Sequence, residues 1–353
     1  MNHHVASSVI EWIYTTSTIV SQSAQQKQNS MVRPISTDLA GVAKDELNED
    51  PSQLESHLSV IRNWLKECTR FHGVLDDQIL LSFLRGCKFS LEKAKQKLSL
   101  FYWIRTTLPE VIQNRDPYED HVLEVIRLGV GTPLPDTVKA TDPKVFIIRV
   151  ARFDLTKITF ADVIKGGTLI NDVLMRDDDQ MVICGMILVI DLAAVTANHL
   201  FQFDFEFLKQ VAILYQDASP LRMQGIHILN PPPGMQTAVN IFNNLLSAKN
   251  KNKRIFAHGS NLKSLHEHLP KEILPEEYGG TLGPIQAFVD EWELKLKANR
   301  DYLLEMANLR DNEASRGTML SASQSFTSSP SSSLTSQQTY FGIDGSFRRL
   351  ELD

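Results

Sequence analysis

The sequence is poor in cysteine and has no long hydrophobic run. Only 3 of its 353 residues are cysteines, and their irregular spacing argues against a disulfide framework and fits a reducing compartment. The longest apolar run, 181–195, contains Asp191 and falls short of the roughly 20 residues that span a bilayer. Residues 5–20 are mildly apolar but lack the basic flank of a signal peptide. These absences predict a cytosolic protein.

Motifs for catalysis and for cofactor binding are also missing. There is no G-x-S-x-G turn and no Walker lysine motif. The glycines of 129–133 lack the third glycine of a dinucleotide fingerprint and are followed by proline instead of a helix. His266 and His268 would point to different sides of a helix, and the acidic turn 177–179 lacks the alternating ligands of a calcium loop. We therefore predict no enzyme, no metal and no cofactor, which makes a hydrolase on an α/β sheet a poor alternative.

Positive charge is not in excess over the whole chain. Its 36 lysines and arginines face 42 acidic residues, for a net charge of −6, so the basic footprint of a nucleic-acid-binding protein is absent. Any attraction to an anionic surface must therefore be local. One local cluster, at 249–254, contains three lysines and one arginine. The 42% hydrophobic content is typical of a globular chain with a sizeable core, and the length predicts about two domains.

The first half of the chain carries helical periodicity. Between residues 51 and 115, apolar residues recur at spacings of three and four, and Ser90 is a candidate N-cap within this region. This pattern predicts a compact helical lobe whose apolar stripes serve packing. We expect 116–135 to be a connection.

From residue 143 on, apolar strand patterns alternate with helical patterns. Continuous apolarity implies strands buried on both faces, as in a parallel sheet. The alternation predicts an α/β domain with a mainly parallel sheet flanked by helices. The predicted strands are 145–150, 181–190, 225–230 and 255–257, and the predicted helices are 159–175, 201–215, 234–248, 261–268 and 288–309.

The helix predicted at 234–248 has two interpretations. It lies between two strands and is followed by the basic cluster 249–254. An amphipathic helix in this position is normally a crossover that covers a sheet, and cations near its end interact favourably with the helix dipole. The same pattern would also suit a hinged lid over an apolar cavity, with a charged contact surface beside the hinge.

Four short motifs, in this order and rough spacing, resemble the CRAL-TRIO lipid-transfer family. The likeness covers roughly residues 34–310. It implies a three-helix N-terminal lobe, an α/β lipid-binding domain with a mobile lid, and a carrier that exchanges its ligand without catalysis. The motifs are FLRG at 83–86, GIH at 225–227, RIFAHG at 254–259 and LPEEYGG at 274–280.

A carrier needs an apolar cavity that is large enough for one lipid. The strands, the helix that follows the second of them and the lid helix all supply candidates. Periodicity does not separate residues that line a cavity from residues that fill a core. The candidates are Ile183, Ile187, Val189 and Ile228 on strands, Phe205, Leu208 and Ala212 on the next helix, and Val239, Phe242 and Leu246 on the lid.

The resemblance also implies contact with phosphoinositides through basic residues near the lid. Two family positions match Arg222 and Arg254, whereas a family arginine falls on Cys87 and a family lysine falls on Asn250. Each cation contributes about 1 kcal/mol near an anionic leaflet, so a few of them would give reversible docking. The expected contact residues are Arg222, Lys249, Lys251, Lys253, Arg254 and Lys88.

Together these features predict a monomeric intracellular carrier that exchanges a tocopherol-like or retinoid-like lipid at phosphoinositide-containing membranes. It would be cytoplasmic and would associate transiently with organelle membranes. The alternative is a phosphoinositide-binding adaptor that transfers no lipid. The expected parts are a disordered extension at 1–33, the helical lobe at 34–125, the lipid-binding domain at 126–285, a C-terminal helix at 286–310, and a Ser-rich linker at 311–353 that ends in either a docking segment or plain disorder.

Overall fold

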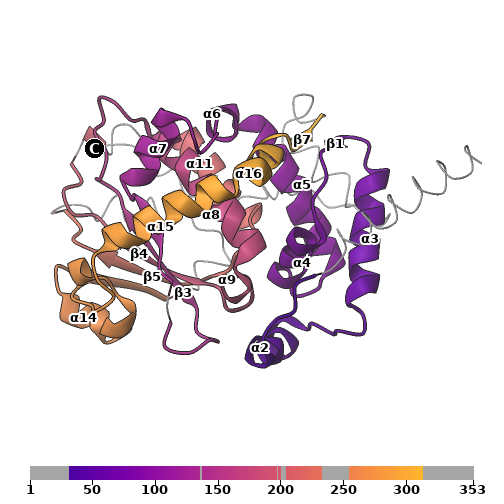
Figure 1. Cartoon of the computed structure of the whole chain (residues 1–353), viewed down its shortest axis with the longest axis horizontal. Helices are drawn as coiled ribbons and strands as arrows, with labels where there is room; N and C mark the ends of the chain where they lie inside the picture. Colours follow the sequence, from indigo (N-terminus) through magenta and orange to yellow (C-terminus); the bar gives the residue numbers. More distant parts are fainter. Residues whose placement is uncertain (1–31, 136, 197, 200–203, 233–253, 313–353) are drawn as a thin grey trace, which may run out of the picture.

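A helical lobe lies beside an α/β domain with one main sheet (Figure 1). The computed structural model describes residues 32–135, 137–196, 198–199, 204–232 and 254–312. The predicted lid helix therefore lies outside the described residues, as do residues 1–31 of the predicted N-terminal extension and 313–353 of the predicted tail. Arg33, which we expected to be in the disordered extension, instead donates a hydrogen bond to the carboxylate of Asp179. In the ranges that are described, no helix has the length and the apolarity needed to cross a membrane.

The lobe confirms the helical pattern of the first half of the chain. Asp76 caps one of its helices, because its side chain accepts a hydrogen bond from the backbone N–H of Ile79. Ser90 does precede a helix, as predicted, but its side chain makes no capping bond. The helices are α2 (Thr37–Leu47), α3 (Leu54–Glu67), α4 (Asp77–Gly86), α5 (Leu91–Thr107) and α6 (Pro109–Ile112).

Residues 116–135 are not a plain connection, and that expectation was wrong. They contain helix α7 (Asp120–Arg127), which buries a four-residue apolar face, and strand β2 (Gly131–Pro133). Pro133 is tolerated in β2 because this strand forms the edge of the sheet.

The main sheet confirms the prediction of a mainly parallel α/β domain. Its five strands run in the order β2-β3-β4-β5-β6. Only β2 is antiparallel to its neighbour. The parallel strands are β3 (Lys144–Arg149), β4 (Met186–Asp191), β5 (Met223–Leu229) and β6 (Arg254–Gly259).

The predicted strand 181–190 is in fact a helix followed by a strand. Helix α9 (Asp179–Cys184) is capped by Gly185, and β4 begins only at Met186. Asp178 fixes the start of α9 by accepting a hydrogen bond from the backbone N–H of Met181. The helix is so short and so completely packed that its apolar run shows no helical period, and such a run cannot be distinguished from a buried strand by pattern alone.

The remaining helices of this domain largely follow the prediction. Helix α8 (Phe160–Asp177) begins with a capping box made by Thr159 and Asp162. The other elements are α11 (Phe205–Ala212), its continuation as the π-helix η1 (Ile213–Asp217), α14 (Leu262–His266), and the 3-10 turns η2 (Lys271–Ile273) and η3 (Glu276–Tyr278).

The last described segment runs from the sheet domain back to the lobe. The single helix predicted at 288–309 is divided at Asn299 into α15 (Ile285–Ala298) and α16 (Arg300–Ala307), which follow one another across the front of the molecule in Figure 1. Strand β7 (Arg310–Asp311) then pairs with β1 (Phe71–His72) of the lobe. We call 285–312 the return segment.

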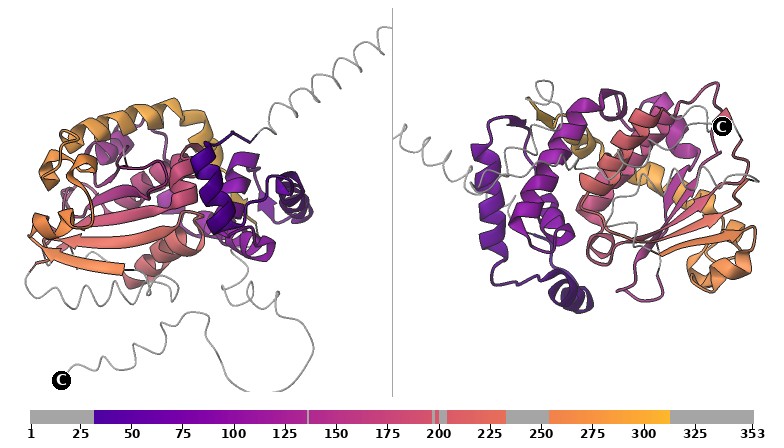
Figure 2. Two further views of the ribbon diagram at one scale, coloured as in Figure 1. Left: turned by 90° about the horizontal axis from the view of Figure 1, so that it is seen from below. Right: turned by 180° about the vertical axis from the view of Figure 1, so that it is seen from behind.

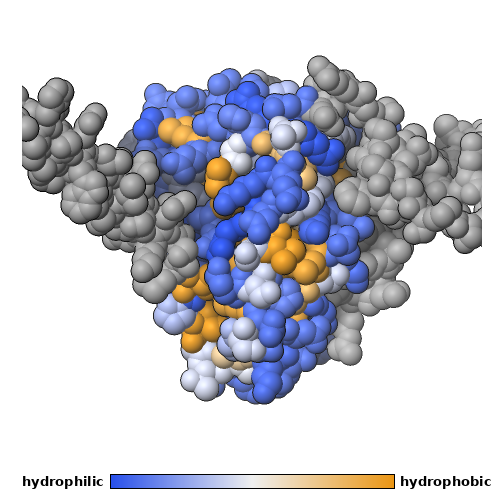
Figure 3. All heavy atoms as spheres, turned by 90° about the vertical axis from the view of Figure 1, so that its right-hand side faces the viewer, coloured by the Kyte–Doolittle hydropathy of each residue, from blue (hydrophilic) through white to orange (hydrophobic). Residues whose placement is uncertain are grey.

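Buried charges join the lobe to the sheet domain. Arg105 and Arg115 both donate to the carboxylate of Asp172 on α8, and all three side chains are almost fully buried. Lys97 on α5 donates to three backbone carbonyls at the end of η1 and just beyond it. Removing one partner of such a group would leave an uncompensated buried charge, so the contact between the lobe and the sheet domain requires these specific residues. Outside, the lobe surface in Figure 3 is mostly hydrophilic with small separate apolar patches.

Candidate functional site

The two faces of the main sheet differ in what covers them. Successive side chains of a strand point to opposite faces, and residues paired across parallel strands share a face. The register therefore divides the sheet into a covered face and an open face. The covered face carries Val145, Ile147, Ile187, Val189, His227, Leu229 and Phe256, and the open face carries Phe146, Ile148, Leu188, Ile190, Ile226, Ile228, Ile255 and Ala257.

Helices from the C-terminal part of the domain pack on the covered face. Val145, Ile147 and Val189 are each 0% exposed and form one core with residues of α14, η2, η3 and α15. The view from behind in Figure 2 places α15 beyond the sheet and α11 in front of it, so α11 lies on the side of the open face.

Beyond the amino-end positions Lys144 and Gln224, the open face is apolar, and it is incompletely covered. Ile190, Ile226 and Ile228 are buried, whereas Ile148 and Leu188 remain partly exposed. Every residue of α11, on the same side, is also only partly buried or exposed. An apolar sheet face that faces an incompletely packed helix is the kind of surface that an apolar ligand can complete.

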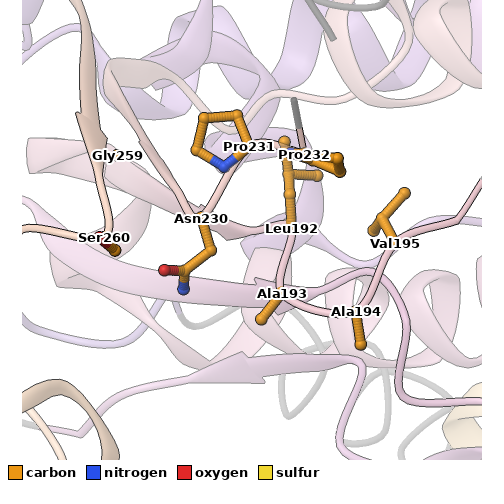
Figure 4. A pocket seen from close by; sticks show the side chains of 9 residues that line it. All are labelled: Leu192, Ala193, Ala194, Val195, Asn230, Pro231, Pro232, Gly259 and Ser260. Carbon is orange, nitrogen blue, oxygen red and sulfur yellow. The ribbon is translucent and has the colours of Figure 1, made fainter. Parts of the chain in front are cut away.

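A pocket of about 490 Å³ opens at the carboxyl ends of the strands (Figure 4). Val195 lines this pocket and also belongs to the apolar cluster of the open face, so the two are contiguous. Ligands of open α/β sheets bind at this end of the strands. The lining residues are Leu192, Ala193, Ala194, Val195, Asn230, Pro231, Pro232, Gly259 and Ser260.

The structure separates the predicted pocket residues on the sheet. Ile228 lies on the open face, but Ile187 and Val189 lie on the covered face, because they alternate with Leu188 and Ile190 along β4. Ile183 is not in the sheet at all, since it belongs to α9 and packs in a core with Ala43 and Leu47 of α2.

The helical candidates divide between described and undescribed residues. Phe205, Leu208 and Ala212 all belong to α11 and are partly buried. The three lid candidates, Val239, Phe242 and Leu246, lie outside the described residues.

Two of the predicted basic residues, Arg222 and Arg254, lie at the amino ends of β5 and β6, and a lobe loop that carries a third packs beside them. We call this region the amino edge. Arg254 begins β6 and is the Cα partner of Gly225. A Cβ on Gly86 would come within 2.3 Å of the carbonyl oxygen of Pro220, so the loop that carries Lys88 lies against the turn that carries Arg222. The remaining contact candidates, Lys249, Lys251 and Lys253, lie outside the described residues.

The environments of Lys88 and Arg222 differ. Lys88 is exposed. Arg222 is partly buried and donates to the carbonyl oxygen of Ile183, and this burial lowers the pKa of its guanidinium. Of the two, only Lys88 is therefore fully available to solvent.

A histidine stack lies on the covered face. Nδ1 of His227 is 2.9 Å from Nε2 of His258, whose Nδ1 is 2.9 Å from the hydroxyl of Ser264. Burial lowers the pKa of both imidazoles, that of His227 to about 4. Both imidazoles therefore have hydrogen-bonding partners within the core. No group of three or more potential metal ligands occurs in the described part of the chain.

Sequence reasoning did not identify the loop between β4 and α11 as part of the site. In the sequence, Asp191 was noted only because it interrupts an apolar run. Its carboxylate accepts hydrogen bonds from the hydroxyl of Tyr278 at 3.0 Å and from the side-chain amide of Asn230 at 2.8 Å. These bonds fix the carboxyl ends of two strands. His199, at a helical position in the same connection, packs edge-on against Phe153. The sequence signal that could have pointed to this connection is an acidic residue at the end of the most apolar predicted strand.

Comparisons with known proteins find related sequences. The profile of the CRAL/TRIO domain matches residues 140–280, and that of the Pinta-like UBA domain matches residues 50–122. The chain is 32% identical over 271 residues to alpha-tocopherol transfer protein-like from Homo sapiens, covering 76% of each chain. It is 29% identical over 264 residues to clavesin-1 from Rattus norvegicus, covering 73% of this chain and 72% of that one. The crystal structure of Sfh5 covers 72% of this chain and 99% of its own, with a TM-score of 0.46 and 14% identity.

The first profile spans the strands β3 to β6, and therefore both faces of the sheet and the pocket at its carboxyl edge. The second covers most of the helical lobe. The chain belongs to the CRAL-TRIO family of lipid-binding and lipid-transfer proteins.

Proposed function

We propose that the protein carries one tocopherol-like or retinoid-like lipid and exchanges it at phosphoinositide-containing membranes. The observation that supports this best is the open face, which is apolar from its middle to its carboxyl end and is left partly exposed beside α11. Burial of apolar surface is favourable by about 25 cal/mol per Å². A lipid bound on this face would therefore remove its own apolar surface and that of the protein from water. Carriage of this kind requires no catalysed reaction.

The amino edge would provide the membrane contact. Lys88, Arg222 and Arg254 come from separate segments that the fold brings to the same end of the sheet. At about 1 kcal/mol per cation, they would give the weak, reversible docking that a cytosolic shuttle needs. The helix predicted at 234–248, which lies in the sequence between the pocket residue Pro232 and β6, would serve as the lid.

A transfer assay tests this function. Donor vesicles of phosphatidylcholine would carry a fluorescent tocopherol, and acceptor vesicles would contain phosphatidylcholine with or without phosphatidylinositol bisphosphate. We expect the monomeric protein to accelerate transfer, and more so toward acceptors with the phosphoinositide. An Ile228→Asp variant, which places a charge on the open face, should lose transfer because burial of an unpaired charge opposes lipid binding.

The adaptor alternative gives a different result in the same assay. An adaptor would bind the phosphoinositide vesicles, as measured by co-sedimentation, without moving the fluorescent lipid between vesicle populations.

Native mass spectrometry of protein purified from its own cells would identify the ligand by mass. A protein that carries no lipid in that spectrum and moves none between vesicles would contradict the carrier proposal.

A further inference from the structure

Backbone donors are scarce in the pocket at the carboxyl ends of the strands. Pro231 and Pro232 are consecutive residues of its lining, and proline has a carbonyl oxygen but no N–H. The N–H of Leu192 is donated to the carbonyl of Leu229, and that of Val195 to the carbonyl of Leu192. These four lining residues therefore offer a ligand no backbone donor.

The orientation of the Asn230 side chain in this pocket is fixed by its partners. Its backbone N–H donates to the carbonyl oxygen of Gly259 at 2.7 Å, and its Nδ2 donates to Oδ1 of Asp191 at 2.8 Å. The same carboxylate accepts from the hydroxyl of Tyr278 and the backbone N–H of Ala193. Because a carboxylate oxygen only accepts, the nitrogen of the amide must face Asp191, and the amide oxygen Oδ1 is turned away from it.

The amide oxygen borders the pocket on the side of a second polar group. In Figure 4 the oxygen of Asn230 lies toward Ser260, which also lines the pocket. Asn230 is only partly buried and Ser260 is exposed, so neither side chain is enclosed in the core. The Ser260 hydroxyl can rotate and therefore either accept or donate. A mostly apolar pocket with a few fixed polar atoms is typical of a site that orients a small molecule.

We propose that Oδ1 of Asn230 accepts a hydrogen bond from the hydroxyl group of the carried lipid. This proposal rests on the carrier function and names its ligand class, an apolar alcohol or phenol. An aldehyde oxygen can only accept, so a lipid that ends in a carbonyl would bring a second acceptor against Oδ1 and leave that oxygen unpaired. The site therefore selects lipids that donate.

The same geometry sets the direction of the lipid. The pocket is contiguous with the open face, because Val195 lines the one and packs with Ile190 and Ile228 of the other. With its hydroxyl on Asn230, the lipid has its polar end at the carboxyl ends of β4 and β5. Its apolar remainder lies along the open face.

Lipids that differ in the hydroxyl group test this selection. Retinol and retinal share one polyene skeleton, and α-tocopherol is matched by its 6-deoxy analogue. Binding is measured by partition from phosphatidylcholine vesicles into the full-length protein. We expect the wild type to prefer the hydroxyl-bearing member of at least one pair by about three- to tenfold, the range of a single neutral hydrogen bond.

A matched pair of glycine variants locates the preference. Asn230→Gly removes the amide oxygen and keeps the backbone, because glycine accepts the positive φ of 50° at this position. It should abolish the preference by weakening only the hydroxyl-bearing lipid, whereas a purely structural role of Asn230 would weaken both members of a pair. Asn114→Gly is the control, since Asn114 is exposed, has the same φ of 50° and lies outside the lining of the pocket. It should leave the preference unchanged.

The outcomes separate the selection from the carrier function. If the wild type shows no preference for the hydroxyl in either pair, or if Asn230→Gly leaves a preference intact or weakens both members alike, the selection is overturned while the carrier function stands. If the wild type binds none of the four lipids, the carrier function itself fails for these ligand classes, and the selection with it.

The position of the hydroxyl end can be measured without a variant. Ala193 and Ala194 line the pocket and are exposed, so protein labelled with carbon-13 in its alanine methyl groups reports on a ligand there. The hydroxymethyl protons of bound retinol should give nuclear Overhauser contacts to these methyl groups. They should give none to the methyl group of Ala43, which is buried between α2 and α9. Contacts from the ring end of retinol instead would overturn the proposal even if Asn230→Gly failed to fold.

Discussion

The covered and open faces belong to the same strands, yet they are built on different principles. On the covered face, α14 and α15 close over side chains such as Val189, and the polar groups there form a hydrogen-bonded histidine stack. On the open face, apolar side chains such as Leu188 keep part of their surface exposed. The difference indicates that one face supplies folding stability, while the other retains apolar surface for a ligand.

Adjacent residues of β3 provide the largest contrast between the faces. Ile147→Ala, on the covered face at 0% exposure, should destabilise the protein by about 2–5 kcal/mol because it opens a cavity in a filled core. Ile148→Ala, on the open face, should cost about 1 kcal/mol or less and should alter lipid binding instead. Urea unfolding and vesicle partition would measure the two effects. Equal destabilisation by both variants would show that the two faces are packed alike.

Acid should weaken the covered face. Burial, together with His258 and His268, lowers the pKa of His227 to about 4, below the value of about 6.5 for an unfolded chain. The unfolded state therefore takes up the proton first, so stability is complete above about pH 6.5 and declines as the pH falls toward 4. For His227 alone, the loss between pH 7.5 and pH 5 should be about 2 kcal/mol.

Urea unfolding at the two pH values measures this loss. His227→Phe should reduce the pH dependence, and the exposed His72 is the matched control, since His72→Gln should leave it unchanged. Glu267 opposes the loss of stability in acid, because its negative charge raises the pKa of His258. A pH dependence that persists in full without His227 would locate its origin elsewhere.

Enlarging neighbouring residues of β4 tests whether free volume exists on only one face. Val189→Phe should cost about 1–3 kcal/mol, because the covered face is already filled. Leu188→Phe should leave the free energy of unfolding nearly unchanged and should reduce lipid uptake, because the larger side chain occupies space that the ligand needs. If Leu188→Phe destabilised the protein as much as Val189→Phe, the open face would be a packed core as well.

The smallest expected effect concerns Lys88 at the amino edge. Lys88→Ala removes one exposed cation and should weaken docking to phosphoinositide vesicles by about 1 kcal/mol, without a change in stability. The effect should shrink at high salt, where screening shortens the range of the attraction. Vesicle co-sedimentation at low and high ionic strength would measure it, with Lys263→Ala as a control on an exposed lysine away from this edge.

The sequence was sufficient to predict the parallel sheet, the helical lobe and the family, because long periodic segments and ordered motifs are local signals. It did not reveal which residues share a face of the sheet. Leu188 and Val189 look alike in a continuous apolar run, and what distinguishes them is the arrival of α14 and α15 from much later in the chain. Ile183 was misplaced for a related reason, since its helix is too short to show a period.

The return segment has a consequence for the timing of synthesis. The backbone N–H of Asp311 donates to the hydroxyl of Thr106, which lies 205 residues earlier in the chain. At roughly 5–20 residues per second, a ribosome needs on the order of 10–40 s to make the intervening chain. During that interval the nascent lobe lacks the strand that pairs with β1, so the edge it exposes must remain soluble, or be shielded by a chaperone, until the return segment emerges.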